Sequence, residues 1–96
     1  MDKQIVSATI VTSEQFQNKC FEIVKEYTER HLDKSDADIP EVKPFIVWYC
    51  KALKNHKALL STNIHDGMYY ELTYNGEKNQ IYFDAYKKFE NRCIDL

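Results

Sequence analysis

The sequence contains little glycine, proline or cysteine: of its 96 residues, two are glycine, two are proline and three are cysteine. Such a scarcity of glycine and proline argues against a disordered or loop-rich chain. Cys20, Cys50 and Cys93 are odd in number and widely spaced, with no Cys-x-x-Cys pair, which argues against a disulfide framework. We therefore expect free, buried thiols in a reducing compartment.

The chain also lacks long apolar runs and an excess of positive charge. No stretch approaches the roughly 20 apolar residues of a membrane-spanning helix, and residues 1–11 lack the apolar core of a signal peptide. The net charge is −2, whereas nucleic-acid binding depends on surplus lysine and arginine. We therefore expect a cytoplasmic protein with no membrane partner, for which nucleic acid is a disfavoured partner.

The residues that are present fit one globular domain over 1–96, since 44% of them are hydrophobic. An amphipathic helix over 13–32 is predicted by apolar side chains that recur at spacings of three and four. This stripe consists of Phe16, Cys20, Ile23, Val24, Tyr27 and His31. Thr12 and Gln15 have the spacing of a capping box, and Ser13 is a competing N-cap.

The segments on either side of this helix carry weaker signals. Residues 1–11 are rich in β-branched side chains and fit either an N-terminal arm or a short strand, and the sequence leaves both alternatives open. Residues 33–44 contain both prolines and several aspartates, which predicts a solvated acidic linker.

Beyond this linker the hydrophobic period changes to two, which indicates β-strands. The strand-like segments are 45–53, 57–64, 68–74 and 80–85. Asn75–Gly76 is the preferred dipeptide of a two-residue type I′ hairpin turn, whereas the first hairpin fits a loop of two or four residues. The predicted fold class is therefore α+β, with the helix packed on a four-stranded antiparallel sheet (45–85) made of two hairpins. A short C-terminal helix over 85–94 is favoured over a longer last strand, because apolar residues there repeat at helical spacing.

A tyrosine-bearing face of this sheet is the predicted binding surface. With the second turn centred on the Asn-Gly pair, Tyr69 faces Tyr82 beside Glu71 on the polar side of the hairpin. Tyr49 and Lys51 join this surface if the two hairpins are neighbours. Tyrosine suits an interface because it presents a large area and a hydroxyl at low entropic cost. A cross-strand aromatic pair also stabilises a sheet without any binding role, so both interpretations stand.

Other reactive side chains are expected to be structural or solvated. The histidines, which lack the close spacing of zinc ligands, are His31, His56 and His65. His56 falls in a predicted turn and is expected to be exposed, whereas Cys50 is placed on an apolar strand face, as an inert thiol. The carboxylates expected to be solvated near one end of the second hairpin are Asp66, Glu71 and Asp84. We therefore expect no enzymatic activity, no cofactor and no metal site.

Three segments of the second half resemble a known family. VWYCKALKNHKALLST, DGMYYELTYNG and YFDAYKKFEN resemble small uncharacterised proteins of phages and prophages of Firmicutes. The resemblance implies a phage origin and the cytoplasm of a bacterial host. Because that family has no known function, the resemblance implies no activity and no site residues.

The leading hypothesis is a small non-enzymatic accessory protein that binds a host or phage protein through the tyrosine-bearing surface. The alternative is a protein that binds or sequesters a small ligand such as a nucleotide signal. The residues expected to supply cations and an aromatic wall for that ligand are Lys51, Tyr86, Lys87 and Lys88. A homodimer is a further option, because a sheet with exposed edges often self-associates.

Overall fold

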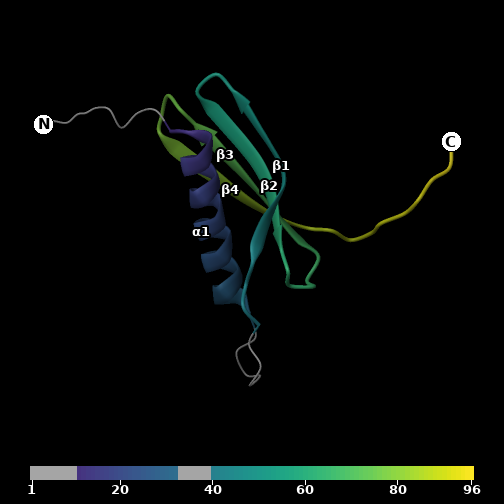
Figure 1. Cartoon of the computed structure of the whole chain (residues 1–96). Helices are drawn as coiled ribbons and strands as arrows, with labels where there is room; N and C mark the ends of the chain where they lie inside the picture. Colours follow the sequence, from purple (N-terminus) through teal and green to yellow (C-terminus); the bar gives the residue numbers. More distant parts are fainter. Residues whose placement is uncertain (1–10, 33–39) are drawn as a thin grey trace, which may run out of the picture.

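The computed structural model describes residues 11–32 and 40–96, which form one helix and one sheet. The elements are α1 (Ser13–His31), β1 (Pro44–Ala52), β2 (Asn55–Thr62), β3 (Met68–Asn75) and β4 (Gln80–Lys87). The strands pair antiparallel in the order β1-β2-β3-β4, and α1 lies across one face of the sheet (Figure 1). The predicted α+β fold is confirmed. The expectations for residues 1–10 and most of the 33–44 linker lie outside the described residues.

The helix α1 begins with the capping box that the sequence predicts. The backbone N–H of Gln15 donates to Oγ1 of Thr12 over 3.1 Å, and the backbone N–H of Thr12 donates to Oε1 of Gln15 over 3.0 Å. Two of the N–H groups at the start of the helix thereby gain acceptors. Thr12 is therefore the N-cap, and the competing choice of Ser13 is wrong.

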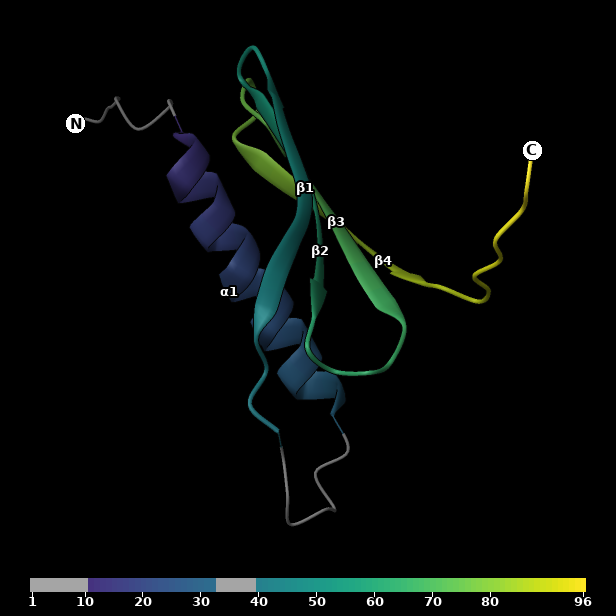
Figure 2. The same ribbon diagram turned by 45° about the vertical axis from the view of Figure 1, so that its right-hand side comes forward.

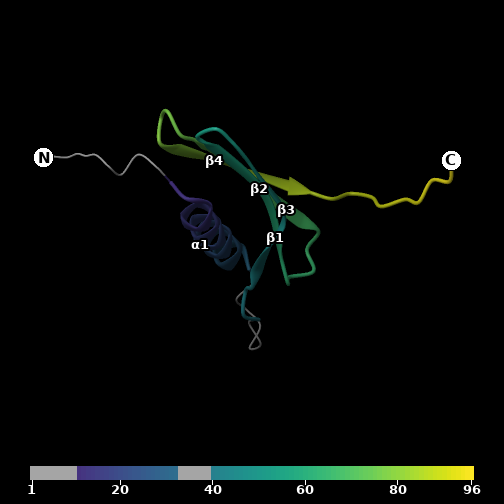
Figure 3. The same ribbon diagram turned by 45° about the horizontal axis from the view of Figure 1, so that its top comes forward.

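The hydrophobic core lies between α1 and the near face of the sheet. The helix buries one side chain on every turn: Phe16, Cys20, Val24 and Thr28. The strands meet it with Ala58, Leu60, Tyr70, Leu72 and Tyr74. Each large apolar side chain buried in this way contributes roughly 1.5–3 kcal/mol. Figures 2 and 3 show α1 on one side of the sheet, and among the described residues no helix or further strand lies on the other side.

A β-bulge in β1 changes which side chains face the helix. Ile46 pairs with Leu60, but the next pair is Trp48 with Leu59, so Val47 is an extra residue on β1. Because side chains alternate along a strand, the extra residue places both Ile46 and Tyr49 on the helix side. The unbroken alternation expected from the sequence would instead put Ile46 and Trp48 on one face, and that expectation is wrong.

The second hairpin has a longer turn than the Asn-Gly pair predicts. Its turn covers residues 76–79, and Asn79 rather than Gly76 adopts a positive φ, of 52°. The side-chain oxygen of Asn75 accepts from the backbone N–H groups of Glu77 (3.0 Å) and Lys78 (3.3 Å), which stabilises the wider turn.

The wider turn moves every cross-strand partner by four residues, so Tyr70 lies opposite Ala85 instead of Ile81. An even shift keeps each side chain on its predicted face, because the strand period is two. It changes the pairs, however: Tyr69 lies opposite Tyr86, and Tyr82 lies opposite Thr73. The expected Tyr69–Tyr82 pair is therefore wrong.

The favoured C-terminal helix over 85–94 is not formed. β4 remains paired with β3 as far as Met68–Lys87, and the backbone N–H of Lys88 donates to the carbonyl oxygen of Gly67 over 2.8 Å. These hydrogen bonds commit the segment to the sheet, and residues 88–96 follow as an extended segment without helix or strand (Figure 1).

Candidate binding surface

The face of the sheet turned away from α1, here called the open face, carries large side chains from all four strands. Alternation along the strands places there Phe45, Trp48, Leu59, Tyr69, Glu71, Tyr82, Asp84 and Tyr86. Four of the aromatic side chains are about half exposed: Phe45 (50%), Trp48 (40%), Tyr82 (49%) and Tyr86 (52%). Apolar area gathered on one face in this way is typical of an interaction surface, whereas single exposed side chains are ordinary.

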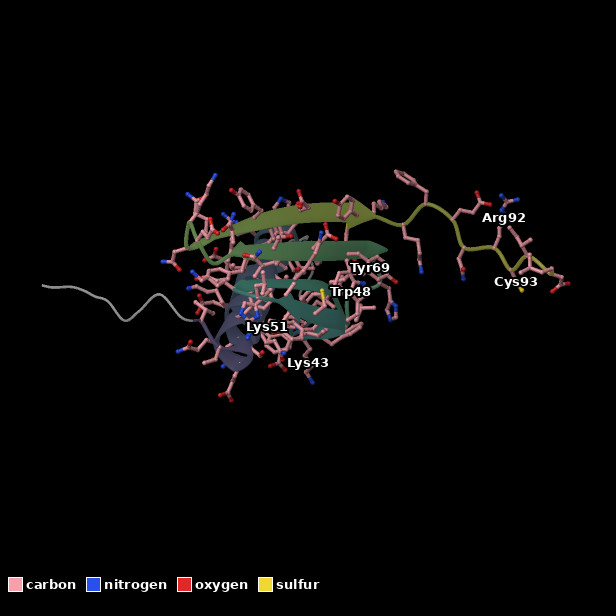
Figure 4. All side chains as sticks on the ribbon, turned by 90° about the horizontal axis from the view of Figure 1, so that it is seen from above. Lys43, Trp48, Lys51, Tyr69, Arg92 and Cys93 are labelled. Carbon is pink, nitrogen blue, oxygen red and sulfur yellow. The ribbon has the colours of Figure 1, made fainter. Side chains whose placement is uncertain are left out.

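Tyr69 lies on the open face near the start of β3, and its side chain is partly buried. The Lys88 ammonium lies 5.6 Å from the centroid of the Tyr69 ring, within the range of a cation–π interaction. Figure 4 shows Trp48 and Tyr69 on the sheet, and Arg92 and Cys93 on the C-terminal segment beyond it. The tyrosine ring therefore already accepts a cation from this chain.

Two carboxylates lie directly opposite one another on the open face. Glu71 of β3 pairs with Asp84 of β4, an arrangement that is destabilising for like charges. Lys57 offsets part of the repulsion, with its Nζ 3.7 Å from Oε2 of Glu71. The carboxylate of Asp84, and to a lesser extent that of Glu71, raises the pKa of Tyr86.

We call Tyr82, Asp84 and Tyr86 of β4, together with Glu71, the acid–tyrosine strip. It combines negative charge with two exposed aromatic rings. Carboxylates pair with guanidinium and ammonium groups, and tyrosine faces attract the same cations. Arginine matches both, because its planar group stacks on rings and bonds to carboxylates in a fork. The strip is therefore suited to a cationic side chain.

The sequence-predicted binding residues divide between the two faces of the sheet. Tyr69, Glu71 and Tyr82 share the open face, whereas Tyr49 and Lys51 lie on the helix side of β1. The two hairpins are neighbours, as the prediction required. However, the β1–β2–β3 pairing aligns Tyr49 with Ala58, and Ala58 with Leu72 of the core. Adding Tyr49 and Lys51 to the open face is therefore wrong.

Tyr49 instead belongs to a hydrogen-bonded network around the buried His56. The Tyr49 hydroxyl lies 2.6 Å from Nδ1 of His56 and 2.7 Å from Oγ of Ser13. Nε2 of His56 lies 3.0 Å from the carbonyl oxygen of Val11, so this nitrogen carries the proton and donates. The ring also stacks on Phe16, with centroids 5.1 Å apart.

The expectation of an exposed His56 in a turn is wrong, because its side chain is 2% exposed. The turn covers Leu53 and Lys54, the shorter of the two lengths that the sequence allows, so β2 already includes His56. The alternation of His56 with Ala58 and Leu60 was the available signal. With both ring nitrogens bonded, His56 joins the start of α1 to β1.

The residues of the alternative ligand site do not converge. A cavity of about 240 Å³ lies near the end of α1, lined by Tyr27, Thr28, His31, Leu32, Asp66, Met68, Tyr70 and Lys87. Of the expected ligand residues, Lys87 is the one that lines it. Tyr86 lies on the open face, Lys88 lies over Tyr69, and Lys51 lies near the opposite end of the sheet, beside the first turn. The cavity is smaller than the roughly 300–1,000 Å³ of typical ligand pockets.

Two further expectations concern cysteines and metals. Cys20 is buried, but Cys50 and Cys93 are exposed, so the expected core position of Cys50 is wrong. Cys50 lies on the open face of β1, which no helix or strand within residues 11–32 and 40–96 covers. Within residues 11–32 and 40–96, no group of three or more candidate ligands is placed to hold a metal ion. In the same part of the chain, no helix is both long enough and apolar enough to cross a membrane.

Comparison with known protein families shows which family the chain is similar to. A model described as a family of unknown function, DUF6275, matches residues 17–96 and so includes most of α1 and the whole sheet. No curated protein and no solved structure matches the chain.

Proposed function

We propose, for a chain that belongs to the DUF6275 family of unknown function, the role of a non-enzymatic binding protein. Its open face would dock a protein that presents arginine or lysine to the acid–tyrosine strip. By the resemblance of its strand segments, we further propose that it is an accessory protein of a phage or prophage. Its partner would then be a host or phage protein in the bacterial cytoplasm.

The observation that carries the proposal is the opposed pair of carboxylates between exposed tyrosines. Glu71 and Asp84 repel one another in the isolated chain, and among the described residues only Glu71 has a basic partner, Lys57. A cation from another protein would relieve this repulsion while it stacks on Tyr82 or Tyr86. Binding of a cationic partner would therefore gain free energy from the relief of the repulsion between Glu71 and Asp84.

The buried histidine network supports a non-enzymatic role. A general base must be able to reach a proton on a substrate. His56 is 2% exposed, and its two nitrogens are bonded to Tyr49 and Val11. Its place in the core is that of a structural side chain. Cys50, although exposed, lies opposite Lys57 on the neighbouring strand and not opposite a histidine.

The test measures binding of a defined cationic probe by NMR. The probe is an acetylated and amidated hexa-arginine peptide, titrated at low ionic strength into the isotope-labelled full chain. We expect shifts of the amides of Glu71, Tyr82, Asp84 and Tyr86 that fade with added salt. A hexa-glutamate peptide should leave them unchanged. Shifts confined to the acidic face of α1 would contradict the proposal.

Two matched variants distinguish binding at the acid–tyrosine strip from non-specific attraction to the negative charge of the protein. Asp84→Asn removes one charge from the strip, and Glu29→Gln removes one from the exposed side of α1. We expect Asp84→Asn to weaken peptide binding several-fold and Glu29→Gln to leave it near the wild-type value. Capture of one protein from host lysate should follow the same order, and equal capture by both variants would contradict the proposal.

A second candidate is the binding of a small anionic ligand in the cavity beside α1. Lys87 and His31 supply positive or polarisable groups there, and Tyr27 and Tyr70 supply rings, although Asp66 opposes an anion. A thermal-shift screen with nucleotides and cyclic nucleotides tests it. We expect any stabilisation to be lost in Lys87→Ala and kept in Lys54→Ala. A flat screen would contradict this candidate.

A further inference from the structure

The two edges of the sheet differ in how well they resist pairing with another strand. β1 carries Pro44 at its start and the bulge at Val47, which are devices that block edge-to-edge association. β4 has no proline, and its register with β3 is regular from Gln80 to Lys87. Among residues 11–32 and 40–96, no strand covers its outer side. The edge of β4 is therefore the one that can accept a strand.

The hydrogen-bond pattern shows which backbone groups this edge offers. The bond from the N–H of Lys88 to Gly67 fixes the phase of the antiparallel ladder, in which bonded pairs alternate with unbonded ones. Even-numbered residues of β4 therefore bond to β3. The N–H and C=O groups of Ile81, Phe83 and Ala85 point outward, ready for a strand on the other side.

We propose that β4 pairs antiparallel with β4 of a second copy of this chain, about a twofold axis at Phe83. The two four-stranded sheets then form one continuous sheet of eight strands. In this register Tyr82 lies opposite Asp84 of the second copy, and Ile81 lies opposite its Ala85. A tyrosine thereby lies beside a carboxylate and not beside a second tyrosine or a second carboxylate, and a large apolar side chain lies opposite a small one.

The neighbouring register about Asp84 is disfavoured by charge. It would set Asp84 directly opposite Asp84 of the second copy, beside Glu71 of each chain. The register about Phe83 avoids this and pairs the strand from Gln80 to Tyr86 in both copies. The two alignments pair strand segments of equal length, 80–86 and 81–87, so charge decides between them.

The rest of the fold leaves room for this dimer. A twofold axis perpendicular to the sheet places both helices on the same face. Because α1 packs on β1, β2 and β3, it does not reach over the outer edge of β4. The two open faces become one, with the acid–tyrosine strips side by side. The dimer does not depend on the proposed docking role, because it forms from the purified chain alone.

The first experiment measures self-association of the full chain. Sedimentation equilibrium over a range of concentrations should show a monomer–dimer equilibrium. Amide hydrogen exchange supplies the register: the amides of Ile81, Phe83 and Ala85 should become protected as concentration rises. Those of Tyr82 and Asp84, which bond to β3, should be protected throughout. A monomer at every concentration overturns the proposal.

Variants at one exposed position test the alignment. Tyr82→Asp sets two carboxylates opposite one another across the interface and should raise the dimer dissociation constant at least about tenfold. Tyr82→Lys sets a cation opposite Asp84 and should keep or tighten the dimer. Because Tyr82 lies opposite Thr73 within its own chain, both variants should fold alike. Equal dissociation constants for the two variants overturn the proposal.

A backbone variant tests the edge itself. Ala85→Pro removes an N–H that points away from β3, so the fold and the protection of Tyr82 and Asp84 should remain. The dimer should be lost. A dimer that persists in this variant overturns the assignment of the interface to the β4 edge.

Discussion

Replacement of Gly76 by alanine should separate the turn of the second hairpin from the turn of the first hairpin and so destabilise the fold. A Cβ atom on Gly76 would lie 2.3 Å from the carbonyl oxygen and 2.5 Å from the Cβ of Lys54. The obstacle is backbone, in a two-residue turn whose Leu53 is already at a φ of 56°. A hydrogen bond also joins the two turns here: the backbone N–H of Gly76 donates to Oδ1 of Asn55 over 2.9 Å. Rotation of the Lys54 side chain therefore cannot make room for a Cβ atom on residue 76, because the atoms in the way are the backbone and Cβ of Lys54.

The expected loss follows from these contacts. Inserting a methyl group into a well-packed contact costs about 1–3 kcal/mol. Loss of the hydrogen bond to Asn55 adds about 1 kcal/mol. Each kcal/mol lowers the melting temperature of a domain of this size by roughly 4–8 °C. We therefore expect Gly76→Ala to lower it by at least about 8 °C.

Gly67 provides the matched control, because it is a glycine for a different reason. Its φ is 72°, and a Cβ atom there would lie 3.5 Å from the carbonyl oxygen of Lys88, an ordinary contact. Alanine should cost about 1–2 kcal/mol through left-handed strain. Asparagine tolerates this conformation and should cost less. At Gly76, asparagine should be no better than alanine.

Thermal melting and urea unfolding of the four variants check the reasoning. Asparagine should recover stability relative to alanine at Gly67 but not at Gly76. If Gly76→Asn were as stable as the wild type while Gly76→Ala was not, Gly76 would serve a left-handed turn, and the packing argument would be refuted.

Four further predictions concern the core, the thiols and the acid–tyrosine strip. Leu72→Ala should lower the unfolding free energy by about 2–5 kcal/mol in urea titrations, because the side chain is fully buried; a loss below about 1 kcal/mol would contradict its place in the core. The two exposed cysteines should react with Ellman's reagent in the native protein, whereas Cys20 should react only after unfolding, and reaction of all three at once would contradict its burial. Burial raises the pKa of Cys20 from 9.0 to about 12, so the unfolded chain loses this proton first and stability should fall as pH rises through that interval. Asp84→Asn should lower the raised pKa of Tyr86 in an ultraviolet titration, and an unchanged pKa would contradict the influence of that carboxylate.

The sequence by itself determined the features that depend on neighbours along the chain. The helical stripe of Phe16, Cys20 and Val24 faces the core, and the capping box of Thr12 and Gln15 starts the helix. The strand period also placed each residue of the second hairpin on its correct face. These signals are local, because the helical period of 3.6 and the strand period of two act over a few residues.

Tertiary structure alone decided the pairings between segments. The side chain of Asn75 stabilised a wider turn and replaced Tyr82 with Tyr86 opposite Tyr69. The bulge at Val47 turned Ile46 toward the helix beside Tyr49. These outcomes rest on single hydrogen bonds and one extra residue, which leave hydrophobic periodicity almost unchanged.

The placement of Tyr49 and Cys50 shows the same division most directly. Both belong to one strand, and the sequence correctly set them on opposite faces. Which face the helix would cover depended on the β2–β3 register and on the packing of Phe16 against His56. Tyr49 was thereby partly buried and Cys50 left exposed, because a strand has two faces and only contact with another layer chooses between them.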